Sequence, residues 1–416
     1  MNEKKSSENS SSIDRQFKPH ELFDVIIIGS GIAGSTFAIR ISQLLDSYGS
    51  TFEKILMIEE KSKNHGTFKV GESLPSETKP VLQSLGIFEM VNNDTNLEKH
   101  LYCYGNRSAW GSNDINGTDS IFNPYGHGFH LDRSLFEETL LKTIELRYGQ
   151  IVKIIRGFSV TDLYFNFNDN CQNLFYILRV TKSYLIVCET QNKIYGKILV
   201  DASGRRCYIR KCVPSLKRYS FDKLLAFACL FETACLNELK DNDHYTLVES
   251  CRYGWFQTSQ LPNNQRIVIF FTDDDLVKQL PQRIRIVDKF CDFLRENTSY
   301  VDKILKKFDY SPLKNRVMCM AANSDMLSEF ASIQNHWIAI GDSAISFDPL
   351  SSQGMLTTLF GSKFGAESVF FQFFYDNRMK NSINLNIHSE KSEKSIDKQD
   401  NAEIQPIEIY QNKMKS

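Results

Sequence analysis

The sequence predicts an α/β protein in which two separated stretches of chain build one parallel sheet, with a mostly antiparallel sheet inserted between them. Near the start, the apolar run DVIIIG enters a glycine-rich turn and then a helix-like run. The middle of the chain, especially residues 222–275, is rich in alternating strands and aromatic residues. A strand, a turn of small residues and a helix return at residues 337–375.

The bulk composition excludes several classes of protein. A length of 416 residues suffices for two domains or for one large α/β domain with an inserted sheet. The net charge of −1 argues against a nucleic-acid binder. The ten cysteines show no CxxC or Cys/His spacing, so we expect reduced thiols in a cytoplasmic protein and no metal site. The N-terminus lacks the apolar core of a signal peptide, and no apolar run is long enough to span a membrane.

Composition also suggests how the chain is divided. The two ends are rich in Ser, Lys, Glu and Asn, which is typical of segments outside a packed core. We divide the chain into a disordered N-terminal tail (1–20), the first part of a nucleotide-binding domain (21–215, with a substrate-side segment near 100–130), an inserted substrate domain (216–330), the last part of the nucleotide-binding domain (331–376) and a polar tail or shortened C-terminal helix (377–416).

The strongest motif is GSGIAG, residues 29–34, between a strand and a helix. In a Rossmann-like βαβ unit the first glycine permits the tight turn, the second lets the backbone approach a pyrophosphate, and the third lets the helix pack closely on the strand. An acidic residue at the end of the next strand accepts hydrogen bonds from a ribose. The residues that this pattern assigns to a dinucleotide are Gly29, Ser30, Gly31, Ala33, Gly34 and Glu59.

Two further turns are suited to an anionic ligand. Asp132 is placed to cap a helix whose first turn carries Arg133, and an arginine there could clamp a pyrophosphate. Pro349 to Gly354 (PLSSQG) is a turn of small residues before a helix, whose N-terminal N–H groups and dipole favour a negative group. The competing interpretations are helix capping alone and a surface charge.

Taken in order, the motifs resemble one known family. They are GSGIAG, KVGESLP, GNRSAWGS, YGHGFHLDR, VDASGRR, GWFQTSQLP and GDSAISFDPLSSQG, spread over residues 22–375. This set resembles the flavin-dependent monooxygenase and tryptophan-halogenase-like family, which has the para-hydroxybenzoate hydroxylase type of FAD fold. Within it, the GESLP, GNRSAWGS and PYGHG segments are most similar to flavoproteins that mature tryptophylquinone enzymes by modifying a tryptophan of a partner protein.

The resemblance implies FAD as the cofactor and assigns residues to it. The glycine-rich turn would hold the pyrophosphate, Glu59 would bind the adenosine ribose, and Arg133 would contact the linker of the cofactor. The turn at residues 349–354 would place its N–H groups at the flavin pyrimidine, where the reduced flavin carries negative charge. The further positions that the resemblance assigns to the cofactor are Glu72, Gly204, Gly341, Asp342, Pro349, Ser352 and Gly354.

The implied chemistry is oxygenation of an aromatic group by a flavin C4a-hydroperoxide, which must be shielded from water. We expect aromatic residues in the pocket wall, with Trp110, Trp255, Phe256 and Phe347 as candidates. His127 and His130 are candidates for proton transfer. Ordinary core packing and a histidine held by its loop are the competing interpretations.

Departures from the family pattern leave alternatives open. Gly254 to Ser259 supplies one tryptophan where halogenases carry WxWxIP, and Lys99 is no convincing match to their reactive lysine, so halogenation is disfavoured. Ala202, Ser203 and Gly204 stand where NADPH-using hydroxylases carry an Asp-Gly pair, which favours a separate flavin reductase as electron donor. The shortened C-terminal segment keeps an inactive FAD-binding relic as a third hypothesis.

Overall fold

The structure is a computed structural model, and it describes residues 21–49, 54–62, 69–112, 114–168, 173–182, 192–233, 240–313, 317–375 and 406–415. The tail expected at residues 1–20 and most of the polar segment expected at 377–416 lie outside the described residues.

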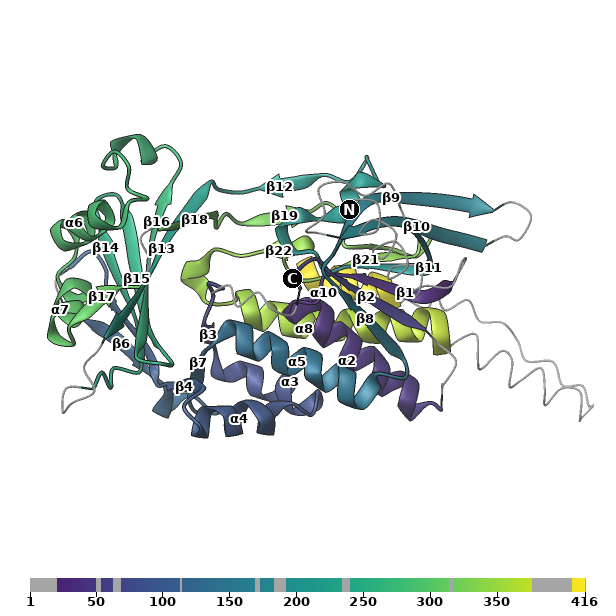
Figure 1. The fold of residues 1–416 in the computed structure, drawn as a ribbon, viewed down its shortest axis with the longest axis horizontal. Coiled ribbons are helices and arrows are strands. Elements are labelled where there is room, and N and C mark those ends of the chain that lie inside the picture. Colours follow the sequence, from purple (N-terminus) through teal and green to yellow (C-terminus); the bar gives the residue numbers. More distant parts are fainter. Residues whose placement is uncertain are drawn as a thin grey trace, which may run out of the picture.

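One sheet has the parallel core that the sequence predicted. Its order is β20-β21-β11-β1-β2-β8, and β10 and β9 extend it from β11 as an antiparallel hairpin. Helices α2, α5 and α8 pack together below it in Figure 1. The bounds are β1 Leu22–Ile28, β2 Ile55–Glu59, β8 Val152–Arg156, β9 Phe158–Asn168, β10 Asn173–Lys182, β11 Asn192–Asp201, β20 Ala331–Ser332, β21 Trp337–Ala339, α2 Ile32–Ser47, α5 Arg133–Tyr148 and α8 Gly354–Val369.

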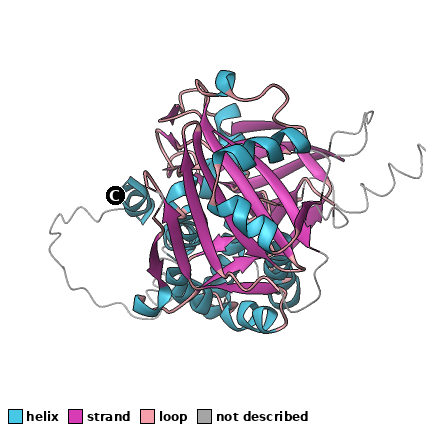
Figure 2. Ribbon diagram, turned by 90° about the vertical axis from the view of Figure 1, so that its left-hand side faces the viewer, coloured by secondary structure: helices cyan, strands magenta, loops and turns pink. Residues whose placement is uncertain are grey.

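The second large sheet follows the order β17-β13-β16-β15-β14-β5-β6, with β18 also paired to β13. Its pairs are antiparallel except β14–β5, so the mostly antiparallel insertion is confirmed. Helices α6 and α7 cover its outer face (Figure 2). The bounds are β5 Gly105–Ala109, β6 Asn116–Asp119, β13 Leu224–Thr233, β14 Tyr245–Cys251, β15 Gly254–Leu261, β16 Gln265–Asp273, β17 Tyr310–Pro312, β18 Met318–Ala321, α6 Val287–Asn297 and α7 Tyr300–Lys307.

Two three-stranded sheets, with orders β3-β7-β4 and β12-β19-β22, lie where the chain passes between the large sheets (Figure 1). The sheet β3-β7-β4 is therefore close to both large sheets. Its strands β3 and β7 include parts of the GESLP and HLDR segments. The bounds are β3 Ser73–Leu74, β4 His100–Cys103, β7 Gly128–Leu131, β12 Arg218–Ser220, β19 Asp325–Leu327, β22 Ile345–Ser346, α3 Lys79–Ser84 and α4 Phe88–Asn96.

Strand β15 shows how the second sheet buries both of its faces. Side chains alternate along a strand, so neighbours point to opposite faces. Phe256 joins the core under α6 and α7, whereas Trp255 joins the core on the other face of the sheet. The face that carries Trp255 is the one turned toward the parallel sheet. Ala226, Ile269 and Phe271 on the same face line a cavity that is also lined by Gly31 and by Gly354 at the start of α8.

The last described segment is helix α10, Pro406–Lys415, which packs against α8 and β20. Tyr410 is fully buried there and donates its hydroxyl hydrogen to the Ala339 carbonyl at 2.8 Å. This part of the expected polar tail is therefore helical and attached to the first sheet. None of the helices in the described residues is long and apolar enough to cross a bilayer.

Candidate flavin site

The turn between β1 and α2 is shaped by its three glycines in different ways. Gly29 has φ +102°, and a Cβ there would lie 2.4 Å from the Ala202 carbonyl oxygen. A Cβ on Gly34 would lie 2.0 Å from the Gly29 oxygen, so only glycine lets the helix pack this closely. A Cβ on Gly31 would meet nothing within 4 Å. The turn is thus packed on the protein side and open on the side where a phosphate would approach.

Glu59, at the end of β2, supports this turn. Its Oε2 accepts hydrogen bonds from the Ser30 N–H at 3.1 Å and from the Ser30 hydroxyl at 2.6 Å. Its Oε1 accepts from the Lys61 N–H at 2.9 Å. The carboxylate orients the glycine-rich turn, and it also lines a cavity beside that turn.

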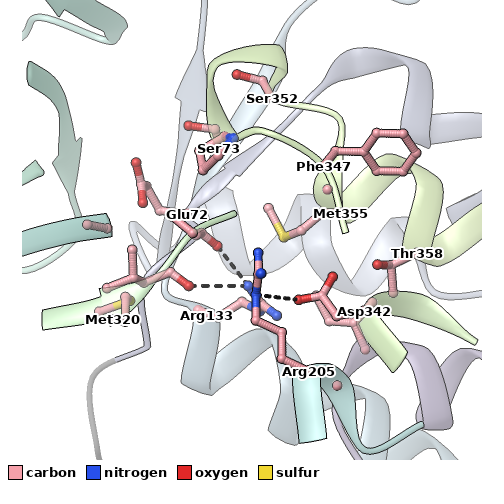
Figure 3. A pocket seen from close by; sticks show the side chains of 18 of the residues that line it. Glu72, Ser73, Arg133, Arg205, Met320, Asp342, Phe347, Ser352, Met355 and Thr358 are labelled. Atoms are coloured by element: carbon pink, nitrogen blue, oxygen red, sulfur yellow. Dashed lines mark hydrogen bonds and ion pairs between the residues drawn. The ribbon is translucent and has the colours of Figure 1, made fainter. Parts of the chain in front are cut away.

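Two cavities meet at the turn. The β2 cavity, of about 250 Å³, extends from Gly31 past Glu59 to Arg206. The α8 cavity, of about 340 Å³, extends from Gly31 to the N-terminus of α8 (Figure 3). Both are lined by Gly31, Ala202 and Gly204, so they adjoin at these residues, and we call the two cavities together the trough. An extended dinucleotide fits this arrangement, with its pyrophosphate at the residue where a Cβ would meet empty space.

Two arginines approach the α8 cavity. Arg133, at the start of α5, is held by Glu137 Oε1 at 3.0 Å and by the Gly71 carbonyl at 3.1 Å. Gly71 has φ +97°, and a Cβ there would come within 2.9 Å of the guanidinium. Arg205 faces Asp342 across the cavity at 3.9 Å (Figure 3). Each guanidinium is paired with a carboxylate, Arg133 with Glu137 and Arg205 with Asp342, and each can also donate hydrogen bonds to a pyrophosphate.

Asp132 caps α5 by accepting a hydrogen bond from the Leu135 N–H at 3.0 Å, so capping accounts for its place in the sequence.

The N-terminus of α8 opens into the same cavity. Pro349, Ser352 and Gly354 line it, and Asp348 stabilises the preceding turn by accepting the Leu350 N–H at 2.8 Å. Ser352 has φ +53°, which turns the chain into the helix in the left-handed region. The first N–H groups of a helix lack partners within it, so this end favours a negative group.

Gly341, the next glycine upstream, has φ +61° and packs against α2. A Cβ there would come within 2.8 Å of the Ala33 Cβ. Ala33 and Gly341 therefore bring α2 close to the turn that carries Asp342, and Ala33 and Asp342 both line the α8 cavity.

Glu72 places a buried carboxyl in the wall between the two large sheets. Its Oε1 accepts a hydrogen bond from Gln257 Nε2 on β15 at 3.3 Å, and its Oε2 has no partner among the described residues. Both side chains line the α8 cavity. An unpartnered buried oxygen is costly, which suggests that a ligand group completes this site.

Four of the candidates for the pocket wall and for proton transfer lie at different places relative to the trough. Phe347 lines the α8 cavity (Figure 3). Trp110 lines a separate cavity near β6. Trp255 is buried behind Phe271, on which its ring stacks at 4.0 Å, and Phe271 lines the α8 cavity. His127 lies among aromatic rings, 4.2 Å from Tyr102, and burial lowers its pKa.

Trp255 does not line the α8 cavity itself, and neither does Phe256. The Phe256 side chain is in the core under α6 and α7, and the next residue, Gln257, reaches the α8 cavity instead. The period-two alternation of β15 decides which of the two faces the cavity.

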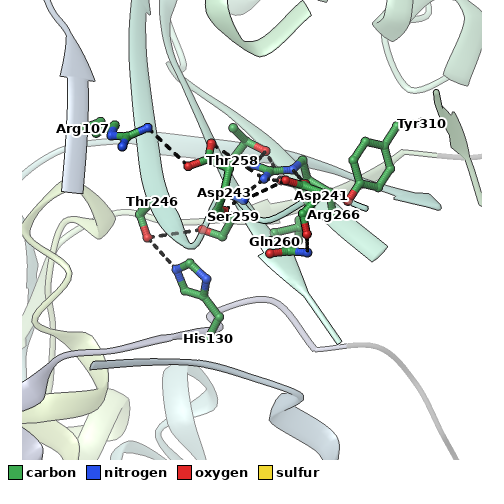
Figure 4. A network of polar contacts seen from close by, with 11 residues as sticks. Arg107, His130, Asp241, Asp243, Thr246, Thr258, Ser259, Gln260, Arg266 and Tyr310 are labelled. Atoms are coloured by element: carbon green, nitrogen blue, oxygen red, sulfur yellow. Dashed lines mark hydrogen bonds and ion pairs between the residues drawn. The ribbon is translucent and has the colours of Figure 1, made fainter. Parts of the chain in front are cut away.

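His130 is fully buried in a polar network behind the trough. Its Nε2 lies 3.0 Å from the Thr246 hydroxyl, which is also 3.4 Å from the Ser259 hydroxyl (Figure 4). The Ser73 hydroxyl lies 3.4 Å from the same Thr246 oxygen. Burial lowers the pKa of His130 to about 4, although Glu72 and Asp243 act against this. His130 is therefore neutral at pH 7.

We expect His130→Asn to reduce the sensitivity of the protein to acid. The pKa of about 4 in the folded state lies below the usual 6.5, so the unfolded chain takes up this proton first as the pH falls. Stability is then lost between pH 6.5 and 4, by up to about 1.4 kcal/mol per pH unit. Urea unfolding at pH 7 and pH 5 should show a smaller loss for His130→Asn. Equal losses in both proteins would contradict the assignment, and Thr246→Val controls for loss of the hydrogen bond.

Several residues of the trough were not predicted from the sequence. Arg205, Phe271 and Met320 all line the α8 cavity. The signal for Arg205 was its place in VDASGRR, next to Gly204. Phe271 and Met320 carried no signal, because strand residues reveal which face they occupy only after the sheet is packed.

Comparison with known proteins adds sequence and fold evidence. No family model matches the chain. The putative FAD-dependent oxidoreductase LodB of Marinomonas mediterranea is 23% identical over 337 residues, covering 80% of this chain and 81% of LodB. The flavin-dependent halogenase chlA of Dictyostelium discoideum is 24% identical over 364 residues, covering 80% of this chain and 58% of chlA.

Among solved structures, the flavin-dependent halogenase CmlS has a TM-score of 0.68 at 18% identity, covering 89% of this chain and 62% of CmlS. This chain therefore spans less than two thirds of the length of chlA and CmlS. The glycine-rich turn, the trough and these similarities indicate that the chain is an FAD-dependent oxidoreductase, similar in sequence to LodB and in fold to flavin-dependent halogenases.

Proposed function

We propose that this oxidoreductase is a monooxygenase that uses reduced FAD and O2 to oxygenate an aromatic group, such as the tryptophan side chain of a partner protein. The observation that carries the proposal is the trough through Gly31, which leads from Glu59 to cavities with aromatic walls. When bound and reduced, FAD supplies the electrons that activate O2.

The chain's own residues fit FAD along the trough. Gly31 leaves room for the pyrophosphate, and the Arg133 and Arg205 guanidinium groups line the α8 cavity, where they can donate hydrogen bonds to it. Glu59 lines the β2 cavity, where the adenosine ribose would lie. The N-terminus of α8 at Gly354 stabilises negative charge on the flavin, by about 0.3–1 kcal/mol and up to about 2 kcal/mol where partly buried.

Apolar side chains from the antiparallel sheet and from the segment around α8 line part of the α8 cavity. Phe271 and Met320 contribute from the antiparallel sheet, and Phe347 and Met355 from the segment around α8. Where these side chains keep water from a bound flavin, they would strengthen electrostatic interactions and limit the wasteful release of peroxide. Glu72, with one oxygen unpartnered, is placed to accept a hydrogen bond from a ligand donor in this wall.

The lining of the substrate-side cavities favours oxygenation over halogenation. Besides the α8 cavity, these are the β3 cavity, beside Ser73 and Phe122, and the β6 cavity, beside Trp110. Among the described residues, none that lines these three cavities is a lysine. Lys99 instead pairs with Asp94 at 3.0 Å on the surface. A reactive lysine is what the family resemblance implies for a halogenase.

The electron donor is proposed to be a separate flavin reductase. The support is the Ala202–Gly204 turn, which lacks the Asp-Gly pair of NADPH-using hydroxylases. Ala202 and Gly204 of this turn line the trough, and neither has a side chain that could bind a nicotinamide cofactor through a charge or a hydrogen bond.

Product mass tests the proposed function. Protein loaded with FAD is reduced in the absence of oxygen. It is then mixed with isotopically labelled O2 and one substrate, which is either free tryptophan or a tryptophan-bearing peptide. Each reaction is run with and without bromide. The expected product gains labelled oxygen and does not depend on halide. Halide in the product would establish the halogenase instead. Full conversion of O2 to peroxide with every substrate would favour an inactive FAD-binding protein.

A further inference from the structure

Three cavities converge on one residue beside the expected flavin position. Ser352, before α8, lines the α8 cavity, the β3 cavity of about 340 Å³ and the β6 cavity of about 370 Å³. Ser73 is shared by the first two and Gln257 by the first and third. A group that reaches Ser352 from outside can therefore enter through either of the two outer cavities.

The walls of the outer cavities carry large apolar side chains that face solvent. Phe122 of the β3 cavity is 87% exposed. Trp110 and Leu350 of the β6 cavity are 50% and 43% exposed. We call these three residues the rim. A pocket for a small molecule turns its apolar groups inward, whereas exposed apolar groups around an opening are typical of a macromolecular contact.

An unpaired strand edge lies between the two outer cavities. Strand β6 is the last strand of its sheet, and within the described residues it pairs only with β5. Its residues Asn116, Gly117 and Thr118 are exposed, and Thr118 lines both the β3 and the β6 cavity. An edge strand offers a row of free backbone donors and acceptors to an added strand.

We propose that the rim and the β6 edge dock an extended segment of a partner polypeptide, which carries the aromatic side chain into the junction at Ser352. The proposal rests on the proposed function and names the binding surface for its substrate. Backbone pairing along β6 positions the segment, and its apolar side chains cover Phe122 and Leu350. The substituent that reaches Ser352 then lies at the N-terminus of α8, beside the expected flavin.

The chemistry of the surface favours a polypeptide over other occupants. A free amino acid would leave Phe122 and the β6 edge exposed. A nucleic acid would need a basic surface, but the β3 and β6 cavities are lined by Glu77, Asp119 and a single cation, Arg107. An extended polypeptide satisfies both the backbone edge and the apolar rim.

Binding of a labelled peptide tests the proposal without turnover. The probe is a short fluorescent peptide with a central tryptophan flanked by valine and threonine, added to protein loaded with oxidised FAD. We expect Phe122→Ser to weaken binding at least tenfold, equivalent to about 1.4 kcal/mol. The matched control is Leu146→Ser, since Leu146 on α5 is 83% exposed but lines none of the cavities described above. FAD affinity should be unchanged in both variants.

Hydrogen exchange provides the second readout. Bound peptide should slow exchange of the amides of residues 116–119, and this protection should be lost in Phe122→Ser. Binding that is equal in Phe122→Ser and the wild type, or protection confined to other segments, would overturn the proposal. Protection of β6 by self-association, detected as a mass that rises with protein concentration, would also overturn it.

The outcomes separate the docking surface from the proposed function. Peptide that binds at the rim but is never oxygenated would support the docking surface and contradict the monooxygenase. Oxygenation of free tryptophan, with no peptide binding, would support the monooxygenase and contradict the docking surface.

Discussion

Replacing Gly31 by Asp should abolish FAD binding and leave the fold intact. A Cβ at this position meets nothing within 4 Å, so the space next to it is where the pyrophosphate would lie. The carboxylate would occupy that space, repel the phosphates and compete for the N–H groups at the start of α2. We expect at least a hundredfold weaker binding, equivalent to about 2.7 kcal/mol, measured by titrating the flavin absorbance.

The same substitution should not destabilise the protein without FAD. Gly31 is the N-cap of α2, with φ −64° and ψ −169°, which any residue can adopt. Asp is a favoured N-cap, so unfolding free energy should stay within about 0.5 kcal/mol of the wild type or rise. Gly34→Ala is the contrasting variant. It should lower the unfolding free energy, because its Cβ would lie 2.0 Å from the Gly29 oxygen. Unchanged FAD affinity in Gly31→Asp would show that the cofactor lies elsewhere.

The second large effect is expected at the buried ion pair of the antiparallel sheet. Arg266 is fully buried, and Asp241 Oδ2 accepts its Nε and Nη2 hydrogens at 3.0 and 2.8 Å (Figure 4). The same oxygen accepts the Tyr310 hydroxyl at 2.9 Å. Asp241→Asn keeps the shape but removes the charge. It should lower the free energy of unfolding in urea by about 3–5 kcal/mol, because the buried guanidinium keeps only the more distant Asp243 carboxylate, at 3.9 Å, as a counter-charge.

Two further variants separate this cause from general disruption. Asp243→Asn alters a partly exposed pair with Arg107, at 3.4 Å, and a longer contact with Arg266, at 3.9 Å, and should cost about 1 kcal/mol or less. Replacing both buried partners, with Asp241→Leu and Arg266→Met, should restore much of the stability lost in Asp241→Asn. If the double variant is less stable than Asp241→Asn, the unpaired charge is not the main cause of the loss.

Local features of the fold were predictable because they depend on short stretches of chain. The turn at residues 29–34 needs glycines whose roles follow from backbone geometry, and Asp132 caps the helix that begins one residue later. The parallel core and the inserted antiparallel sheet followed from apolar runs and alternation. The helix α10 was only partly foreseen, since its buried Tyr410 meets a partner 71 residues away.

The site beyond the glycine-rich turn depended on how distant segments pack. The sequence alone determined the cofactor class, because GSGIAG and its flanking strand and helix already specify a dinucleotide turn. Only the tertiary structure decided that Gln257, not Phe256, meets Glu72, and that three cavities converge on Ser352. The physical reason is that a strand offers two equivalent faces, and the choice between them is made by what each face buries against elements far away in the chain.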